Sequence, residues 1–412
     1  MARRALILVE GHRSIGPLYV NAARRLGLHP ITLSADPARY DYLVAAESLE
    51  AVRVDTGDLD ALIRECSRLR ASYDIAGIVG LSGDDESIYA TAAKLCQYFD
   101  VPGPNPASIE RCCDKFSQRR LLEEAGVPIP AYRLAANAAD VENSAAEIGL
   151  PVIVKPAAGT GSGGVRLCRN MDELAEHTIY LLGEKDLWRS SPRLLIEEFA
   201  HGQQYSVNTM GNEVIAVGEV EFYGPPNFVV CNSMYPAILD DYKYRIIEDA
   251  SLSCLDSLDL GWGPANIELR WTKRGPVIIE VNPRLPGWTT PQLIELAYGV
   301  DPIAEHLNLA MGQEWDFRRR HSHTAAARFL VPERDGVLDW IEGDSLAASI
   351  PGVAEIRLYA ESKSPIVRKG DFRDTIGHVI AVGASRAETE AILLRAIGLI
   401  GWSITPFPTL GE

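Results

Sequence analysis

The spacing of apolar residues predicts alternating strands and helices in the first hundred residues. Residues 5–9 are continuously apolar, a turn follows at 11–16, and a helical spacing of apolar side chains comes next. Apolar runs at 29–33 and 75–81 indicate two further strands, and residues 84–99 have the pattern of a helix. Strands that alternate with helices in this way are typical of a parallel sheet covered on both faces.

A different pattern begins near residue 113. Residues 114–125 have the spacing of a helix that ends at Gly126, and several short apolar runs follow. The expected strands are 151–156, 194–198, 205–209, 214–220, 265–270 and 276–281, the last two joined by a hairpin-like turn. The final hundred residues mix strand and helix signals, and the basic stretch at 318–321 is a candidate domain boundary.

Composition and charge narrow the range of partners. The chain has 412 residues, of which 47% are hydrophobic and 23% charged, values typical of globular domains rather than of disordered or fibrous proteins. The formal net charge is −16, and Lys and Arg form no long basic stripe, so nucleic acid is not expected as a partner. An acidic protein that binds an anion must rely on individual basic residues, backbone N–H groups and metal ions.

The sequence also lacks the usual signs of a membrane or secreted protein. No run approaches the ~18 apolar residues that a membrane helix requires, and the first apolar run is too short for a signal peptide. The seven cysteines are odd in number and include no CxxC pair, so we expect reduced, mostly buried thiols. A cytoplasmic location without a membrane partner is therefore expected.

A glycine-rich segment follows Lys155, which ends an expected strand. Glycines occupy positions 159, 161, 163 and 164. Their backbone N–H groups can converge on one anion because no Cβ blocks the approach, and the lysine supplies the opposite charge. This arrangement suits a triphosphate, although a flexible surface loop would have the same composition. It is not a Walker A loop, since no Gly-Lys-Ser/Thr sequence follows.

Oxygen-bearing side chains interrupt two apolar strands. Glu280 and Asn282 are two residues apart and therefore point to the same face, and the hairpin partner can place Glu268 beside them. Such a group matches the ligands of Mg²⁺, whereas a structural explanation would require a matching cation on the same face. Arg284 extends this face and could hold a carboxylate or phosphoryl oxygen, or else form an ordinary surface salt bridge.

Four segments occur in order along the chain: DKFSQRRLLEEAGVPIP at 114–130, PVIVKPAAGTGSGG at 151–164, LIEEFAHGQQYSV at 195–207, and IELR with VIIEVNPR within 267–284. Together they resemble the ATP-grasp superfamily, and the resemblance covers essentially the whole chain. It implies an α/β and α+β protein of the ATP-grasp fold. The implied domains are a Rossmann-like parallel-sheet domain at 1–112, an ATP-grasp domain at 113–318 with a lid subdomain at about 126–200, and a C-terminal α+β domain at 319–412.

The resemblance also implies roles for particular residues. The nucleotide-binding positions are Lys115, Lys155, Gly159, Gly161, Ser162, Gly163, Gly164, Glu197, Glu198, Phe199, Ala200 and Gln204. In the family the two lysines contact phosphates, the glycine-rich loop closes as a lid, Glu197 receives the adenine amino group, and the backbone near Phe199 forms the adenine hinge. Gln204 departs from the family pattern, which usually has a ribose-binding glutamate there; an amide can still accept a sugar hydroxyl.

The metal and substrate positions follow in the same way. Glu268, Glu280 and Asn282 fall on metal-binding positions, where two Mg²⁺ ions are expected and Mn²⁺ is expected to substitute. Arg284 and Lys155 fall on the catalytic positions. Arg284 would also contact substrate, since the family arginine stabilises the acyl phosphate and the tetrahedral intermediate.

Within the superfamily, the segment that ends at Trp288 (PRLPGW) is similar to amino acid ligases that make dipeptides. In those ligases a tryptophan four residues after the arginine walls the pocket for the activated amino acid; a tryptophan of the protein core is the alternative here. The implied enzyme is a homodimeric carboxylate–amine ligase that joins two amino acids, by a dipeptide or γ-glutamyl-type bond, through an acyl phosphate. The alternatives are a biotin-carboxylase-like or purine-pathway carboxylase and an inactive nucleotide-binding regulator.

Overall fold

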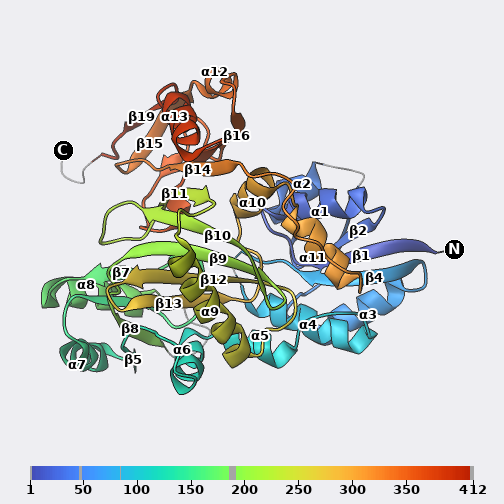
Figure 1. The fold of residues 1–412 in the computed structure, drawn as a ribbon, viewed down its shortest axis with the longest axis horizontal. Helices are drawn as coiled ribbons and strands as arrows, with labels where there is room; N and C mark the ends of the chain where they lie inside the picture. The colour runs from blue at the N-terminus through green and yellow to red at the C-terminus, as the bar shows by residue number, and fades with distance from the viewer. Residues whose placement is uncertain (1, 46–48, 84, 185–191, 409–412) are drawn as a thin grey trace.

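The computed structural model of the protein describes residues 2–45, 49–83, 85–184 and 192–408. Its elements form three regions: an N-terminal sheet with its helices, a small sheet at 132–198, and a large sheet that runs on into the C-terminal region (Figure 1). All seven cysteines are free thiols, as predicted, and Cys113 is the one that is partly exposed. Within the described residues, no helix is both long enough and apolar enough to cross a bilayer.

The N-terminal region is the predicted parallel sheet, with strand order β3-β2-β1-β4. Its strands are β1 (Arg3–Val9), β2 (His29–Ser34), β3 (Glu50–Arg53) and β4 (Tyr73–Gly80). Helices α3 (Leu59–Leu69) and α4 (Ser87–Phe99) cover one face, and α1 (Gly16–Arg25) with the distant α11 (Pro302–Ala310) covers the other. Residue 84, where the helix at 84–99 was expected to begin, lies outside the described residues. Short elements complete the region: η1 (Pro37–Arg39), α2 (Asp41–Val44) and α5 (Pro106–Cys112).

The large sheet has eight antiparallel strands in the order β13-β12-β9-β10-β11-β14-β18-β16. The strands are β9 (Gln203–Met210), β10 (Glu213–Phe222), β11 (Val230–Tyr235), β12 (Pro264–Thr272), β13 (Gly275–Asn282), β14 (Thr324–Leu330), β16 (Val353–Leu358) and β18 (Gly377–Gly383). Helices α6 (Lys115–Glu124) and α9 (Asp241–Leu258) pack on the apolar face of its first strands. The opposite face of those strands carries polar residues.

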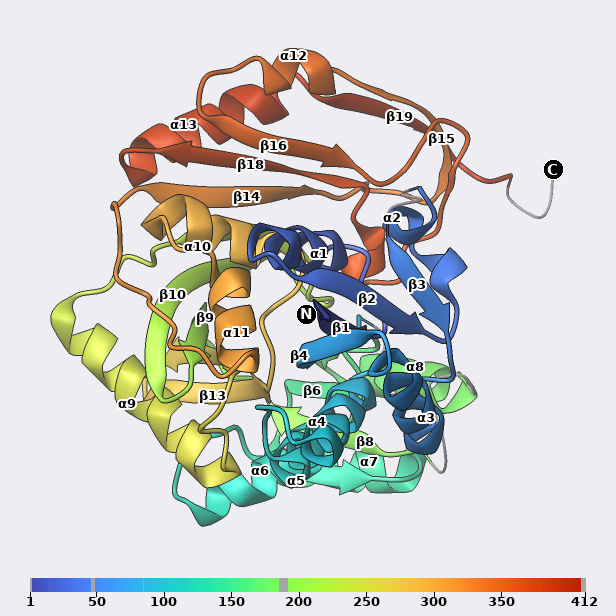
Figure 2. The ribbon, with the colours of Figure 1, turned by 90° about the vertical axis from the view of Figure 1, so that its right-hand side faces the viewer.

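The C-terminal region adds three strands to the large sheet and also forms a smaller sheet of its own. Strands β14, β18 and β16 lie side by side above α10 (Thr290–Tyr298), which packs on one face of β14 (Figure 2). Helix α13 (Arg386–Ile397) packs on the opposite face. A second sheet of three strands, β17-β15-β19, flanks them. Its elements and the short helices nearby are β15 (Gly336–Glu342), β17 (Pro365–Ile366), β19 (Gly401–Thr405), α12 (Asp344–Ala348) and η3 (Phe372–Asp374).

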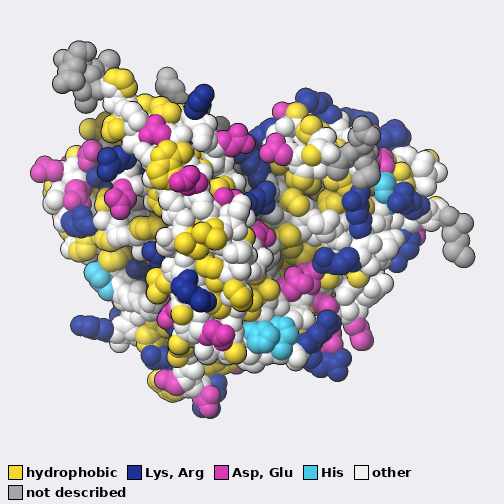
Figure 3. Space-filling model, turned by 90° about the horizontal axis from the view of Figure 1, so that it is seen from above, with side chains coloured by type: hydrophobic (Ala, Val, Ile, Leu, Met, Phe, Trp, Pro, Cys, Tyr) yellow, Lys and Arg dark blue, Asp and Glu magenta, His cyan; other side chains and the backbone are white. Residues whose placement is uncertain are grey.

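The small sheet has the order β5-β8-β6-β7 and is antiparallel. Its elements are β5 (Tyr132–Ala135), β6 (Val152–Pro156), β7 (Arg166–Cys168) and β8 (Leu194–Glu198), covered by α7 (Ala138–Ile148) and α8 (Met171–Gly183). It lies beside the β12–β13 hairpin (Figure 1). On the face drawn in Figure 3, Lys and Arg are interspersed with acidic and apolar side chains.

Candidate active site

The β12–β13 hairpin brings the predicted metal-binding residues together. Glu268 lies directly opposite Glu280 in the antiparallel register, and Asn266 lies opposite Asn282. The turn at 272–275 leads to the pairing of Leu269 with Ile278, and a β-bulge between Glu268 and Leu269 then shifts the register by one residue, which brings Glu268 opposite Glu280. Alternation along each strand turns these residues to the polar face of the sheet. Glu268 and Glu280 are thus neighbouring carboxylates in a largely desolvated place.

Lys115 connects this acidic pair with the glycine-rich loop. Its Nζ lies 2.9 Å from Oε1 of Glu280 and donates to the carbonyl oxygen of Gly159 at 2.5 Å. Helix α6, which begins with Lys115, is fastened to β13 because the side chain of Gln118 donates to and accepts from the backbone of Val281 at 2.9 and 3.0 Å. The lysine is therefore held against β13.

The charges of this cluster shift one another's pKa values in different directions. Burial, together with the charge of Glu280, raises the pKa of Glu268 to about 7. Burial acts to raise the pKa of Glu280 as well, but Lys115 and Lys155 outweigh it and hold that pKa below its usual value. Near neutral pH the pair thus combines an ionised Glu280 with a Glu268 whose pKa lies close to the pH of the solution.

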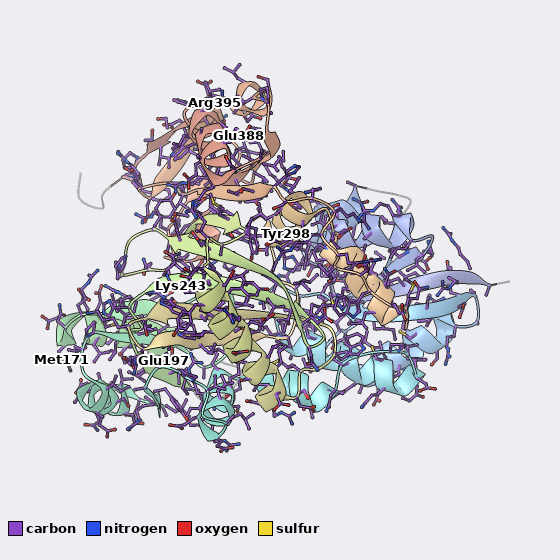
Figure 4. All side chains as sticks on the ribbon, in the orientation of Figure 1. Met171, Glu197, Lys243, Tyr298, Glu388 and Arg395 are labelled. Carbon is purple, nitrogen blue, oxygen red and sulfur yellow. The ribbon has the colours of Figure 1, made fainter. Side chains whose placement is uncertain are left out.

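Lys155 lies on β6, and Glu197, labelled in Figure 4, lies on the neighbouring strand β8 of the small sheet. Its Nζ is 2.6 Å from Oε2 of Glu197, and Nε of Arg119 is 2.6 Å from Oε1. Burial acts to raise the pKa of Glu197, but these two cations outweigh it and lower that pKa. Both carboxylate oxygens are thus engaged, and adenine binding by Glu197 would require Lys155 to move toward the phosphates.

Arg119 is a site residue that the sequence reading missed. It is 1% exposed, and besides Glu197 it donates through Nη2 to the carbonyl oxygen of Ile279 on β13, so it joins the small sheet to the large one. A helical arginine among several charged residues usually faces solvent. Only the three-dimensional contact distinguishes this one.

The segment expected to form the adenine hinge consists of Glu198, Phe199 and Ala200, and two arginines contact it. Alternation along β8 turns Glu198 away from Glu197, and both of its oxygens accept from Nη2 of Arg274 at 2.8 Å. A nucleotide contact at position 198 would therefore come from its backbone. Phe199 follows β8, and the guanidinium carbon of Arg270 lies 5.1 Å from its ring centre. The carbonyl oxygen of Ala200 accepts from Nη1 of Arg270 at 3.2 Å.

Gln204 lies between Arg270 and the acidic pair. Its Nε2 donates to Oε2 of Glu268 at 3.0 Å, and its Oε1 accepts from Nε of Arg270 at 3.1 Å. A glutamate at 204 would place a third carboxylate beside Glu268 and Glu280, whereas the amide both donates and accepts. Glutamine at position 204 therefore joins Glu268 to Arg270 without adding a further negative charge. Arg270 is the second site residue that the sequence reading missed.

The glycine-rich loop has a backbone shape that depends on its glycines. Gly159, Gly161 and Gly164 have φ values of +127°, +65° and +71°, and Ser162 also lies in the left-handed region at +63°. Gly163 does not share this conformation. The loop lies over the site, because Lys115 holds its residue 159.

Arg284 lies at the same place and has contacts that the sequence reading did not foresee. Its Nη2 donates to Oε1 of Glu86, from the N-terminal region, at 3.0 Å and to Oγ1 of Thr160 in the glycine-rich loop at 3.2 Å. Its buried Nε has no hydrogen-bond acceptor within the described part of the chain. Since buried donors are seldom left unpaired, this nitrogen suits an oxygen of a ligand.

Trp288 closes the loop that begins at Arg284. It has a φ of +59°, and its backbone N–H donates to Oγ of Ser14 at 3.0 Å. Its ring lies 4.8 Å from that of Phe329 and 6.1 Å from that of Phe372, measured between ring centres. It is half-buried and packs against the apolar cluster of α10 and β14, so it lies at the edge of the core.

The donor set fits a hard divalent cation. Two carboxylates and one amide come from the paired strands of the β12–β13 hairpin, and Lys115 links Glu280 to the glycine-rich loop. Within the described residues, no group of three or more His, Cys, Asp or Glu side chains offers a rival metal site. Mg²⁺ is typically bound by one or two carboxylates together with phosphate oxygens and water. Lys115, which pairs with Glu280, partly occupies the position that such an ion would take.

Comparison with known proteins identifies the family. A model of the ATP-binding domain of the carbamoyl-phosphate synthase L chain matches residues 114–317, and a model of the L-amino acid ligase C-terminal domain 2 matches residues 328–405. The chain belongs to the ATP-grasp superfamily. Its domains match those of the ATP-grasp carboxylate–amine ligase family, and the chain resembles the L-amino acid ligases.

Solved structures support this ATP-grasp assignment at the level of the fold. The L-amino acid ligase from Bacillus licheniformis has a TM-score of 0.84 and 20% identity, covering 98% of this chain and all of that one. Phosphoribosylglycinamide synthetase from Anaerococcus prevotii has a TM-score of 0.71 and 19% identity, covering 98% of this chain and all of that one. The predicted ATP-grasp fold, with its N-terminal parallel sheet, is confirmed.

Two related sequences extend over nearly all of this ATP-grasp chain. An uncharacterized protein, y4rH, of Sinorhizobium fredii is 55% identical over 410 residues, covering 100% of this chain and 85% of that protein. Human carnosine synthase 1 is 27% identical over 428 residues, covering 95% of this chain. The chain spans only about half the length of that synthase, since the match covers 50% of it.

Proposed function

We propose that the protein is an ATP-dependent amino acid ligase, which activates the carboxylate of one amino acid and joins it to the amine of a second. The observation that carries this proposal is the continuity of contacts from the acidic pair to the aromatic residues. Lys115 joins Glu280 to the glycine-rich loop, Arg284 holds the same loop, and Trp288 lies at the far end of the arginine's own segment. The resemblance to L-amino acid ligases supports the choice of substrate class.

In the proposed reaction, a carboxylate oxygen of the first amino acid attacks the γ-phosphorus of ATP, and the bond to the bridging oxygen breaks to release ADP. The amine of the second amino acid then attacks the acyl carbon. Phosphate leaves as the C–O bond breaks, and the amine loses a proton. Arg284 is placed to oppose the negative charge of the acyl phosphate and of the tetrahedral intermediate, because its unpaired Nε is buried near the glycine-rich loop.

Lys115 and Lys155 are proposed to transfer from their carboxylate partners to the nucleotide phosphates. Glu268, Glu280 and Asn282 are proposed to hold two Mg²⁺ ions, for which Mn²⁺ could substitute; such ions supply Lewis-acid neutralisation of phosphate charge. Glu280 is suited to this role because its two cationic neighbours lower its pKa and keep it ionised. A homodimer located in the cytoplasm remains part of the proposal.

A coupled assay of ADP release over pairs of amino acids, with mass spectrometry of the products, tests the function. The proposal predicts ADP formation that depends on two amino acids and an amide product that contains both. ADP release stimulated by bicarbonate and not by amino acids would favour the carboxylase alternative. A flat response to every pair and to bicarbonate, in a protein that binds ATP, would favour a nucleotide-binding regulator.

A further inference from the structure

Three successive residues of the glycine-rich loop are each held by a different part of the chain. The carbonyl oxygen of Gly159 accepts from Lys115, and the hydroxyl of Thr160 accepts from Arg284. The carbonyl oxygen of Gly161 accepts from the backbone N–H of Phe372, in η3 of the C-terminal region, at 3.3 Å. In the proposed function, Lys115 and Arg284 bind the phosphates and the acyl phosphate, so the first two contacts change when ligands bind. Of these three contacts, the one with Phe372 does not depend on a charged side chain.

Gly161 and the ring of Phe372 fit together closely. A Cβ added to Gly161 would lie 2.4 Å from Cδ1 and 3.0 Å from Cε1 of Phe372, far inside van der Waals contact. The φ of Gly161 is +65°, which disfavours any side chain independently of the space. The loop backbone therefore rests directly on the aromatic ring.

The turn that carries Phe372 is held rigidly by its own side chains. The carboxylate of Asp374 accepts from the backbone N–H groups of Lys369 and Gly370 at 2.6 and 2.9 Å. The carboxylate of Asp371 accepts from the backbone N–H and Nε of Arg373, both at 2.9 Å. These bonds fix the position of Phe372 before any ligand binds, which lowers the cost of ordering the site.

The same ring also touches the aromatic residues beyond Arg284. Its centre lies 6.1 Å from that of Trp288 at an interplanar angle of 66°, an edge-to-face contact, and Trp288 packs in turn on Phe329. Contacts thus run in a closed ring from Arg284 to Thr160, Gly161, Phe372 and Trp288, and back through the backbone to Arg284. The side chain of Phe372, from the C-terminal region, thus contacts both the glycine-rich loop and Trp288.

We propose that Phe372 is a positioning and specificity residue: it seats the glycine-rich loop in its closed position and completes the aromatic wall around the activated amino acid. This inference rests on the proposed ligase function. A well-seated loop keeps water from the acyl phosphate. When the contact between Phe372 and the loop is lost, water attacks the acyl carbon in place of the amine. The C–O bond to phosphate then breaks, and the free amino acid and phosphate leave. ADP then forms without an equal amount of amide.

The first test measures amide and ADP together for Phe372→Ala and Phe372→Leu in the full-length protein. We expect the amount of amide per ADP to fall, with loss of amide formation up to about 100-fold for a displacement near 1 Å, and the alanine variant to be affected more. Phe407→Leu, the same change at an exposed place in the C-terminal region, should leave the ratio unchanged. A fall in both products by one common factor would overturn the proposal, because it would indicate a merely structural role.

The second test requires no turnover. Gly161→Ala, Phe372→Ala and the double variant form a cycle in which the free energy of unfolding is measured in urea. Gly27→Ala serves as the control for strain, since Gly27 also has a positive φ of +75° but no neighbouring atom within 4 Å of an added Cβ. We expect the double variant to lose less stability than the sum of the single losses; strict additivity would overturn the proposal. If the wild type forms neither ADP nor amide with any pair, the proposed function and the role of Phe372 both fail, and the cycle still reports on the contact.

Discussion

Replacing Glu280 by glutamine removes one charge from the site and preserves the shape of the side chain. At the observed 2.9 Å between Lys115 and Glu280, and an effective dielectric constant of about 20, their attraction is about 6 kcal/mol before desolvation is subtracted. Loss of one partner of a buried pair costs about 3–5 kcal/mol. Lys115 keeps Gly159 as an acceptor, so we expect the free energy of unfolding to fall by about 3 kcal/mol.

The effect of Glu280→Gln on catalysis should be larger than its effect on folding. A catalytic metal supplies several kcal/mol of charge stabilisation, and a loss of about 4 kcal/mol corresponds to about 1000-fold in rate. ADP release is measured with saturating Mg²⁺, and urea unfolding is measured on the same sample. Glu213→Gln, an exposed position in the same large sheet, is the matched control. Wild-type ADP release from folded Glu280→Gln protein would refute the assignment of Glu280 to the metal site.

Three further predictions address other parts of the site. Because the pKa of Glu268 is raised to about 7, the folded protein favours the protonated carboxyl, and the contribution of Glu268 to stability falls as pH rises from about 4.5 to 7. Mg²⁺ competes with that proton, so the apparent affinity for Mg²⁺, measured by titration, should rise over the same pH range. The Glu268→Gln variant should lose this pH dependence. Arg119→Ala should lower the free energy of unfolding by about 3–5 kcal/mol, because a buried charge of Glu197 loses a partner; a urea midpoint equal to that of the wild type would contradict this. Trp288→Ala should allow larger amino acids on the carboxylate side while ADP release persists, and an unchanged substrate range in the product screen would rule out its role as a pocket wall.

The fold was largely predictable because its local signals are strong. Continuous apolar runs predicted the buried parallel strands of the N-terminal sheet. The expected hairpin around 272–275 predicted that Glu268 would lie near Glu280, but not the β-bulge that brings the two directly opposite each other. The C-terminal strands were harder, because nothing in the sequence of β14 indicates that it pairs with β11 and extends the large sheet. The domain bounds stay a prediction, and α11, from the expected ATP-grasp range, packs on the N-terminal sheet.

The site was predictable to the extent that its residues lie in recognisable segments. Lys115, Lys155 and the acidic pair come from such segments, and the structure brings them together; their roles stay predictions. Arg119, Glu86 and Phe372 could not be found in this way, because each acts through a contact with a segment distant in the sequence. An arginine, a glutamate and a phenylalanine carry no signal of such contacts until the chain is folded.

A crystal structure with Mg²⁺ and a non-hydrolysable ATP analogue tests the central claim most directly. The account predicts metal ions at about 2.0–2.1 Å from oxygens of Glu268, Glu280 and Asn282. Lys115 and Lys155 would then have left their carboxylates for phosphate oxygens, with the glycine-rich loop closed over them. Nucleotide bound elsewhere, or metal bound without these three side chains while Lys115 stays on Glu280, would contradict it.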